Sequence, residues 1–327
     1  MLNEDLNDDT RCSDRSIAGL SLSVIIPTYN GAEQLRELLA SFTIQTVTPD
    51  QILIVDSSSS DGTTQVAEKY NAEVIVIDRE TFDHGSTRSM AAKKARGEIL
   101  IYFTQDVLPV HRRVLENLVR PIIDSDDIAV SYGRQLPAFN ASEAAAHLRY
   151  FNYPEESSIR SFADRNVSGL KTVFVSNSCA AYRKTQLADI NYFRNGLIFG
   201  EDTCAVGRLL QQGRKIAYAA DAAVYHSHNY SWSEEFRRYF DIGVLHASEK
   251  WLLQTYGSAR NQGSEYVRSG ISFLCKRRKY GLISDFVVRI VLKYLGYRLG
   301  LHYRRIPRKM IPNLSMHKRW WNGKELV

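Results

Sequence analysis

The residues with the clearest potential for chemistry are carboxylates that follow apolar runs. Asp56 ends one such run, and Asp61 follows five residues later. Asp106 comes shortly after another apolar run, and the pair Glu201–Asp202 precedes an amphipathic segment. In open α/β folds, ligands bind at the carboxyl edge of the sheet, where acids at strand ends gather. Together these acids indicate a site for a nucleotide sugar.

Asp56 and Asp61 fit a nucleotide-binding role, and a purely local role fits them equally well. A carboxylate at a strand end can accept a hydrogen bond from a base imide N–H or from a ribose hydroxyl. Alternatively, Asp56 caps the turn that follows it, and Asp61 forms a tight turn with Gly62. Neither GxGxxG nor GxxxxGK[ST] follows the first apolar run, which argues against dinucleotide and P-loop sites.

Two histidines, His226 and His228, stand two positions apart after a short apolar run. In an extended chain their side chains point to the same face, so both can reach one site. A lone histidine is more often structural than ligating, whereas a pair beside a cluster of acids favours a metal. Imidazole nitrogens suit Mn²⁺ better than Mg²⁺.

A regular alternation of apolar patterns provides the scaffold for these acids. We expect strands at residues 22–27, 51–56, 73–78 and 99–104, and helices at residues 32–42, 63–70, 89–96 and 112–123. Continuous apolar strands that alternate with amphipathic helices are typical of a doubly wound sheet. The sequence therefore predicts an α/β fold with a mostly parallel central sheet.

The pattern is less regular in the rest of the chain. We expect strands at residues 128–133, 173–175, 180–182, 215–218 and 222–225, and helices at 138–170 (interrupted by a loop), 203–212, 233–256, 264–279 and 283–301. Residues 1–20 are polar, which predicts a disordered leader. The chain is thus divided into this leader, an α/β domain at residues 21–235, and a helical, basic region at residues 236–327.

The composition is that of a soluble globular protein, with 44% hydrophobic and 24% charged residues in a chain of 327. The four cysteines lie far apart and form no CxxC pair, which favours neither a zinc site nor a disulfide framework. A reduced, cytoplasmic chain is expected. No apolar run reaches the roughly 18 residues of a membrane-spanning helix.

The net charge of +6 conceals a strong asymmetry. From residue 271 onwards there are 14 Lys and Arg against two acidic residues. Apolar residues recur at helical spacing in the same stretch: Phe286, Val287, Ile290, Val291, Tyr294 and Leu295. A cationic amphipathic helix, with Trp320 and Trp321 nearby, predicts binding to an anionic membrane surface. The alternatives are packing on the α/β domain and formation of a homo-oligomer, and no motif indicates nucleic-acid binding.

Several ordered motifs resemble those of the family 2 glycosyltransferases, which have the GT-A fold. These motifs are SVIIPTYN at residues 23–30, IVDSSSSDGT at 54–63 and GED at 200–202. Three more segments resemble bacterial rhamnosyltransferases of surface-polysaccharide synthesis: residues 82–88, 103–109 and 225–231. The resemblance covers residues 21–232 and continues more weakly through residues 293–300.

The resemblance implies a role for each candidate residue. Asp202 would be the catalytic base, and Glu201 would orient the acceptor. Asp106 would hold Mg²⁺ or Mn²⁺ against the donor's phosphates, joined by a histidine, with His228 preferred to His226. The triplet at residues 104–106 is Thr-Gln-Asp, which lacks the first acid of the family's DxD motif. The remaining candidates would bind the donor: Pro27, Tyr29, Asn30, Asp56, Asp61, Arg88 and Gln105.

The expected function follows from this resemblance. An inverting glycosyltransferase would move L-rhamnose from dTDP-L-rhamnose to a lipid-linked oligosaccharide in O-antigen or capsule synthesis. It would work in the cytoplasm, peripherally bound at the inner face of the cytoplasmic membrane. The alternatives are a family 2 transferase with a UDP-hexose donor, and a catalytically silent, membrane-associated binding protein.

Overall fold

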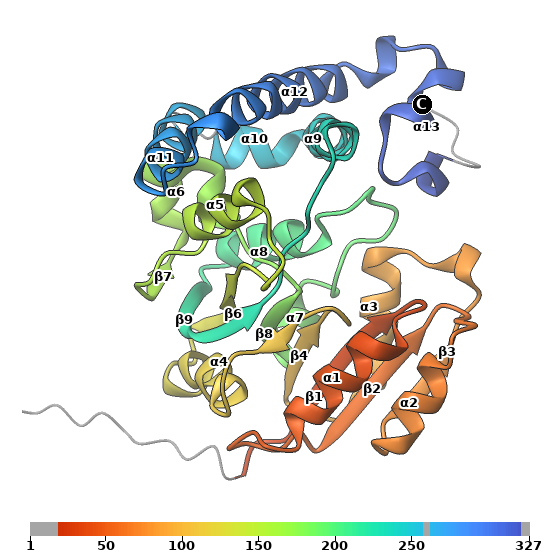
Figure 1. Ribbon diagram of the computed structural model, residues 1–327. Helices are drawn as coiled ribbons and strands as arrows, with labels where there is room; N and C mark the ends of the chain where they lie inside the picture. The colour runs from red at the N-terminus through yellow and green to blue at the C-terminus, as the bar shows by residue number, and fades with distance from the viewer. Residues whose placement is uncertain (1–18, 258–261, 322–327) are drawn as a thin grey trace, which may run out of the picture.

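The computed structural model describes residues 19–257 and 262–321. The predicted leader, residues 1–20, therefore lies almost entirely outside the described residues. In the described part of the chain, nine strands form one sheet in the order β3-β2-β1-β4-β8-β6-β9-β5, with β7 paired to β9. Helices cover both faces of this sheet, and further helices lie beyond one edge (Figure 1). The predicted α/β fold is confirmed.

The N-terminal half of the sheet is parallel, as predicted. It consists of β1 (Leu22–Thr28), β2 (Gln51–Asp56), β3 (Glu73–Val76) and β4 (Ile99–Phe103). The helices of this half are α1 (Ala32–Phe42), α2 (Thr63–Lys69), α3 (His84–Lys94) and α4 (Val114–Asp124). Alternate strand residues face opposite layers. Val24 and Ile26 belong to the core layer of α1, α2 and α4, whereas Ile25 belongs to the layer that contains α3.

The other half of the sheet is mixed, although most strands of the whole sheet still run in one direction, as predicted. β8 (Cys179–Arg183) runs antiparallel to both of its neighbours, β4 and β6 (Ile128–Leu136). β9 (Lys215–Tyr225) runs parallel to β6 and antiparallel to the short strands β5 (Leu108–Pro109) and β7 (Ser158–Arg160). β8 lies next to β6 in the sheet and runs in the opposite direction, so the connection between these two strands need not cross the sheet.

Several element boundaries differ from prediction for local reasons. α3 begins at His84 and not at residue 89, because the Asp83 carboxylate accepts hydrogen bonds from the N–H groups of Gly85 and Ser86 and caps the helix. α8 (Glu201–Gln211) also begins earlier than predicted, so its two acids belong to its first turn. The strands predicted at residues 215–218 and 222–225 form the single strand β9, whose register shifts opposite β6.

The segment between β6 and β8 differs most from prediction. The helix expected at residues 138–170 is the shorter α5 (Glu143–Asn152), followed by β7 and by α6 (Arg165–Ser168). The strand expected at residues 173–175 overlaps the end of a 3₁₀ turn and a loop. A short helix, α7 (Lys184–Asp189), was not predicted.

The C-terminal region is helical, as predicted. It contains α9 (Trp232–Ser248), α10 (Lys250–Tyr256), α11 (Gln262–Lys276), α12 (Ile283–Leu301) and α13 (Ile311–Leu314). The domain boundary predicted at residue 235 falls inside α9. A Cβ at Gly300 would lie 2.0 Å from the Phe240 carbonyl oxygen, so the close approach of α12 to α9 requires glycine there. Among the described helices, none is both long and apolar enough to cross a membrane.

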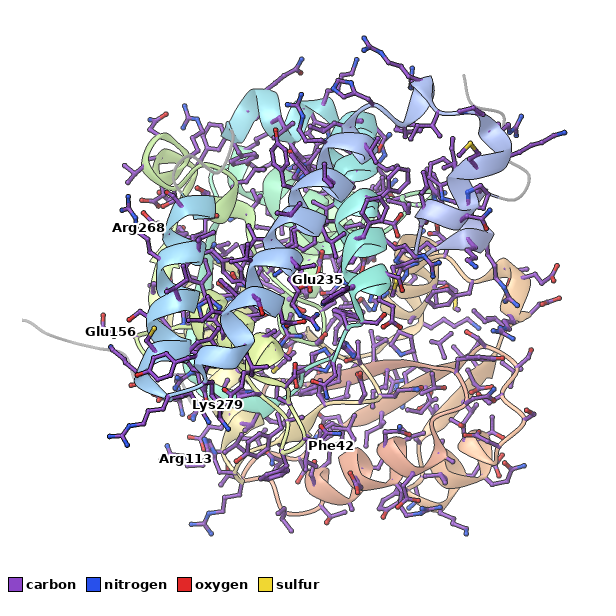
Figure 2. All side chains as sticks on the ribbon, turned by 45° about the horizontal axis from the view of Figure 1, so that its top comes forward. Phe42, Arg113, Glu156, Glu235, Arg268 and Lys279 are labelled. Carbon is purple, nitrogen blue, oxygen red and sulfur yellow. The ribbon has the colours of Figure 1, made fainter. Side chains whose placement is uncertain are left out.

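Part of the predicted basic tail is internal. Glu235 of α9, labelled in Figure 2, faces α12. Its carboxylate pairs with Arg289 at 2.8 Å and with Lys293 at 3.0 Å, and all three side chains are largely buried. These two cations neutralise an internal carboxylate, so the tail presents less positive charge to solvent than its sequence suggests.

Candidate active site

A cavity of about 710 Å³ opens at the carboxyl ends of β1, β2 and β4. Five of the predicted site residues line it: Pro27, Tyr29, Arg88, Gln105 and Asp106. The lining also includes residues that sequence analysis did not select, among them Ser57, Arg79, Asp83, His84 and the C-terminal residues 316–320. The cavity lies where parallel α/β sheets bind ligands.

The first part of the wall is formed by Tyr29 and Arg79. The guanidinium carbon of Arg79 lies 4.0 Å from the centre of the Tyr29 ring. An aromatic face and a planar cation in this arrangement can both stack on a nucleobase. Arg79 was missed by sequence analysis because the stacking joins residues of different loops.

Asp56 is fully buried behind this wall, and its oxygens are occupied. Its carboxylate accepts hydrogen bonds from the Thr28 hydroxyl at 2.9 Å, the Ser59 hydroxyl at 2.6 Å and the Ser59 N–H at 2.8 Å. The neighbouring Ser57 lines the cavity. Asp56 thus holds the loop beside the cavity, which is the local role considered above as the alternative to nucleotide binding. Its contact with a nucleobase stays a prediction.

Asn30 and Asp61 lie outside the cavity lining. The Asp61 carboxylate accepts hydrogen bonds from the Thr63 hydroxyl at 2.5 Å and from the Ala32 N–H at 3.0 Å. The Thr63 hydroxyl is the main cause of a lowered pKa of Asp61. Asn30 accepts a hydrogen bond from the Ser60 N–H at 2.9 Å. Both side chains therefore fix the loops after β1 and β2, and their contact with the donor stays a prediction.

Asp106, His226 and His228 converge on one point, and their ligating atoms all lie within 4.8 Å of one another. The Nδ1 atom of His226 is 3.6 Å from one Asp106 oxygen, and Nε2 of His228 is 3.8 Å from the other. The sequence left open which histidine joins Asp106; the structure brings both to it.

This group of three residues fits a divalent metal. The Nδ1 atom of His226 is buried and has no hydrogen-bond partner in the described structure. The other ring nitrogen of His226 lies 3.3 Å from the Ser178 hydroxyl, which orients Nδ1 towards Asp106. Burial lowers the pKa of His226 to about 4, although Asp106 acts in the opposite direction, so the imidazole is neutral and can donate its lone pair.

Gln105, the middle residue of the Thr-Gln-Asp triplet, does not serve as a ligand here. Its amide oxygen accepts a hydrogen bond from the Tyr29 N–H at 2.8 Å, and its amide nitrogen donates to the Tyr29 carbonyl at 3.2 Å. Both polar atoms of this side chain are therefore used to fix the backbone of Tyr29. A carboxylate could not donate the second of these bonds.

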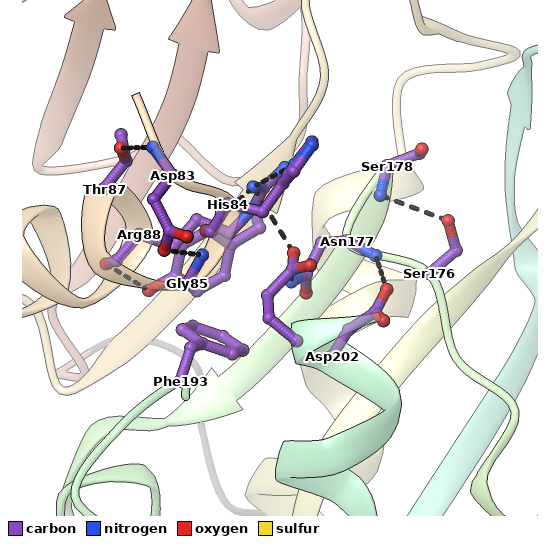
Figure 3. A network of polar contacts seen from close by, with 12 residues as sticks. Asp83, His84, Gly85, Thr87, Arg88, Ser176, Asn177, Ser178, Phe193 and Asp202 are labelled. Atoms are coloured by element: carbon purple, nitrogen blue, oxygen red, sulfur yellow. Dashed lines mark hydrogen bonds and ion pairs between the residues drawn. The ribbon is translucent and has the colours of Figure 1, made fainter. Parts of the chain in front are cut away.

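Glu201 and Asp202 are adjacent in α8, but their surroundings differ sharply. Figure 3 shows Asp202 beside Asn177. Glu201 is 4% exposed and pairs with Arg88 at 3.3 Å. Asp202 is half-buried, and its carboxylate accepts hydrogen bonds from the N–H groups of Asn177 at 3.2 Å and Thr203 at 2.7 Å. Glu201 thus positions other groups, while Asp202 keeps some access to solvent.

The pKa values of the two carboxyls move in opposite directions. Burial and the negative charge of Glu201 raise the pKa of Asp202 to about 7. Burial acts on Glu201 in the same direction, but the nearby Arg88 and His84 outweigh it and lower the pKa of Glu201. Two acids with separated pKa values are typical of an acid–base site.

Arg88, predicted to bind the donor's phosphates, already has an internal partner. Besides its contact with Glu201, its guanidinium donates to the His84 carbonyl at 3.1 Å. Arg88 as a whole is only 5% exposed, although it contributes to the cavity lining. Arg88 therefore links the cavity to the carboxyls of α8, which do not line it.

The loop before β8 contacts both the carboxyl pair of α8 and a candidate metal ligand. Sequence analysis gave this loop no role. Asn177 binds Asp202 through its N–H, and its side-chain amide donates to Glu201 at 3.1 Å. The next residue, Ser178, contacts His226. The sequence Ser-Asn-Ser between two apolar segments was the available signal, and small polar residues are too common in loops for it to stand out.

Comparison with known proteins places this architecture in a family. Residues 23–190 match the family model described as Glycosyl transferase family 2, which is more than half of the chain. The chain is 39% identical to the O-antigen chain rhamnosyltransferase WbaN of Salmonella anatum, with 93% of this chain and 96% of that protein covered. It is also 39% identical to the O-antigen chain rhamnosyltransferase RfbN of Salmonella typhimurium, with 93% and 97% covered.

A solved structure supports the fold. The mannosyltransferase PcManGT from Pyrobaculum calidifontis, in complex with GDP-Man and Mn²⁺, matches with a TM-score of 0.56 at 16% identity. The match covers 93% of this chain and 88% of that chain, so it includes the C-terminal helices. At this identity it bears on the fold alone, and it confirms the GT-A type that the motifs predicted.

Proposed function

Because the chain belongs to glycosyl transferase family 2, we propose that it transfers L-rhamnose from dTDP-L-rhamnose, with inversion, to a lipid-linked oligosaccharide of O-antigen synthesis. The observation that carries this proposal is the near-complete match to two O-antigen chain rhamnosyltransferases. The cavity beside Asp106, with an aromatic wall at one end, supports a nucleotide-sugar donor.

Asp202 is proposed as the base of the transfer. The acceptor hydroxyl attacks the anomeric carbon as the bond from that carbon to the phosphate oxygen breaks, and the hydroxyl proton passes to Asp202. A base is most effective when its pKa lies near the working pH. The raised pKa of Asp202, which burial and Glu201 cause, meets this requirement.

Asp106, His226 and His228 are proposed to hold a divalent cation. Mn²⁺ is favoured over Mg²⁺ because two of the three ligands are imidazoles. When bound, such an ion supplies charge neutralisation to a leaving diphosphate. The Asp106 carboxylate serves both as a ligand and as part of the cavity wall.

A thermal-shift panel of nucleotide sugars tests the choice of donor. We expect dTDP-L-rhamnose with Mn²⁺ to raise Tm more than UDP-glucose or UDP-galactose, because a ligand that binds the folded state stabilises it by mass action. At a hundredfold excess over Kd the stabilisation is about 2.7 kcal/mol. A larger shift with a UDP-hexose would assign the donor to that class and overturn the rhamnosyl proposal.

The exposed face of α12 is the proposed membrane-binding surface. Its large apolar side chains are exposed by 41–61%: Val287, Val291, Tyr294, Leu295 and Leu299. Exposed cations flank this face at both ends, in residues 276–279 and 304–309. An apolar stripe between cationic ends matches an anionic lipid surface, and each cation near such a surface contributes about 1 kcal/mol. We therefore propose peripheral binding at the inner face of the cytoplasmic membrane, where a lipid-linked acceptor is presented.

The residues that make this surface differ from those predicted. Phe286 of the predicted stripe is 3% exposed and packs against Gly270 of α11. Trp321 is 7% exposed and lies in a core cluster with Phe240 and Tyr303. Neither side chain can enter a membrane while it is packed in this way, which corrects the expectation of a tryptophan anchor.

Sedimentation with anionic vesicles tests this surface. We expect wild type to pellet with vesicles at low salt and to be released as salt screens the cations. The substitutions Val291→Ser, Tyr294→Ser and Leu295→Ser together should abolish pelleting, while the control Val76→Ser, another exposed valine, should not. Equal pelleting of wild type and the triple variant would exclude this face. A loss of oligomeric mass in the triple variant, without any effect on vesicles, would identify it as an interface between copies.

A further inference from the structure

The last described turn of the chain forms one wall of the donor cavity. Five consecutive residues, Met316, His317, Lys318, Arg319 and Trp320, line the same cavity as Tyr29 and Asp106. Figure 1 shows this segment returning from the end of α12 towards α3. Sequence analysis grouped it with the membrane-binding tail, because nothing in the local pattern shows which distant element it meets.

Specific contacts hold this segment against the domain. The buried Asp241 of α9 accepts hydrogen bonds from the N–H groups of Met316 at 2.9 Å and His317 at 3.3 Å. The His317 ring stacks on Phe199, with 18° between the ring planes. The Trp320 indole donates to the Gly196 carbonyl at 3.1 Å. The segment is thus fixed on both sides of Lys318 and Arg319.

The cavity has four Lys and Arg side chains in its described lining: Arg79, Arg88, Lys318 and Arg319. Arg79 is stacked on Tyr29, and Arg88 is paired with Glu201. Lys318 and Arg319 are exposed, and neither has a hydrogen-bond or ion-pair partner in the described part of the chain. Their donors are therefore free for a phosphate, and neither side chain is held by a stacking or ion-pair contact as Arg79 and Arg88 are.

We propose that residues 316–320 form a wall of the nucleotide-sugar site and that Lys318 and Arg319 bind the donor's diphosphate. The proposal rests on the function proposed above, because it takes the ligand to be a nucleoside diphosphate. Lys318 and Arg319 thereby supply the cationic contact that sequence analysis assigned to Arg88. Asp241 acts as a positioning residue, since it holds the backbone from which both cations project.

Titration calorimetry with dTDP, and with UDP in parallel, tests the two cations. The double variant Lys318→Ala/Arg319→Ala should weaken binding of the nucleoside diphosphate about 10- to 100-fold, the effect expected from loss of charge-assisted hydrogen bonds. Binding of the uncharged nucleoside should be unchanged, because it carries no phosphate. The matched control Lys94→Ala/Arg112→Ala removes two exposed cations that belong neither to the cavity lining nor to the proposed membrane-binding surface, and it should behave as wild type.

The outcomes separate the two proposals. If wild type binds dTDP or UDP and the Lys318/Arg319 variant binds it equally well, the diphosphate assignment is wrong and the proposed function stands. If wild type binds neither nucleotide, the proposed function fails and this inference fails with it. Asp241→Ala removes the acceptor of both N–H groups, so it should weaken diphosphate binding with both cations still present. Unchanged binding by a folded Asp241→Ala protein would contradict the positioning role.

Discussion

Replacing Asp202 by asparagine is expected to lower kcat by about two to four orders of magnitude, the range for loss of a general base. Asparagine keeps the size of the side chain and one acceptor oxygen, but it cannot take a proton from the acceptor. Asp202 does not line the donor cavity, so the Kd for the donor should stay close to that of wild type. Single-turnover transfer and donor calorimetry measure the two quantities separately.

The control for this substitution is Asp189→Asn, the same change at an exposed aspartate of α7. It should leave both quantities unchanged. Near wild-type transfer by the Asp202 variant would remove Asp202 from the role of base.

The pH profile gives a second test of the same assignment. Burial and the charge of Glu201 raise the pKa of Asp202 to about 7. The base acts only when it is deprotonated, so kcat/KM of wild type should rise with pH through about 7 and then level off. In the Asp202→Asn variant this rise should be absent. A wild-type profile that is flat across neutral pH contradicts the assignment.

Asp106→Ala is expected to abolish the response to Mn²⁺. Loss of a residue that only supports a metal ligand typically lowers metal affinity 10- to 100-fold. Asp106 is itself a proposed ligand and the single carboxylate of the group, so its removal should lower the affinity for Mn²⁺ by at least about this factor. Electron paramagnetic resonance of free Mn²⁺ measures binding without reference to activity. Asp221→Ala, at an exposed aspartate of β9, is the matched control.

Ser178→Ala tests the contribution of a residue that supports a metal ligand without binding the ion itself. The Ser178 hydroxyl orients His226 and does not belong to the ligand group, so its loss should weaken Mn²⁺ binding less than the loss of Asp106. If wild type and Asp106→Ala bind Mn²⁺ with equal affinity, the metal does not bind at this group.

The parts of the fold that depend on local pattern could be predicted. The bounds of β2, α1 and α12 agree with prediction because a continuous apolar run, or a helical repeat between clear stops, determines each of them. The antiparallel insertion of β8 could not be predicted, since its direction depends on where the preceding connection lies and not on its own residues.

In the candidate site, too, some features could be predicted from the sequence and others could not. Asp106, His226 and His228 could be predicted to meet, because each follows a strand whose end reaches the same edge of the sheet. The pairing of Arg88 with Glu201 and the position of Lys318 in the cavity could not, because both result from packing between segments that are distant in sequence. In the case of Arg88, an internal partner changed the expected role.

The most direct test of the account follows radiolabelled rhamnose from dTDP-L-rhamnose. Purified full-length protein, Mn²⁺ and the lipid-linked oligosaccharide fraction of the native host are incubated together, and the label in the lipid fraction is measured. We expect label to enter this fraction with wild type, and to be reduced by orders of magnitude with Asp202→Asn. No transfer of label from dTDP-L-rhamnose by wild type, under conditions where a UDP-hexose is consumed, would contradict the account.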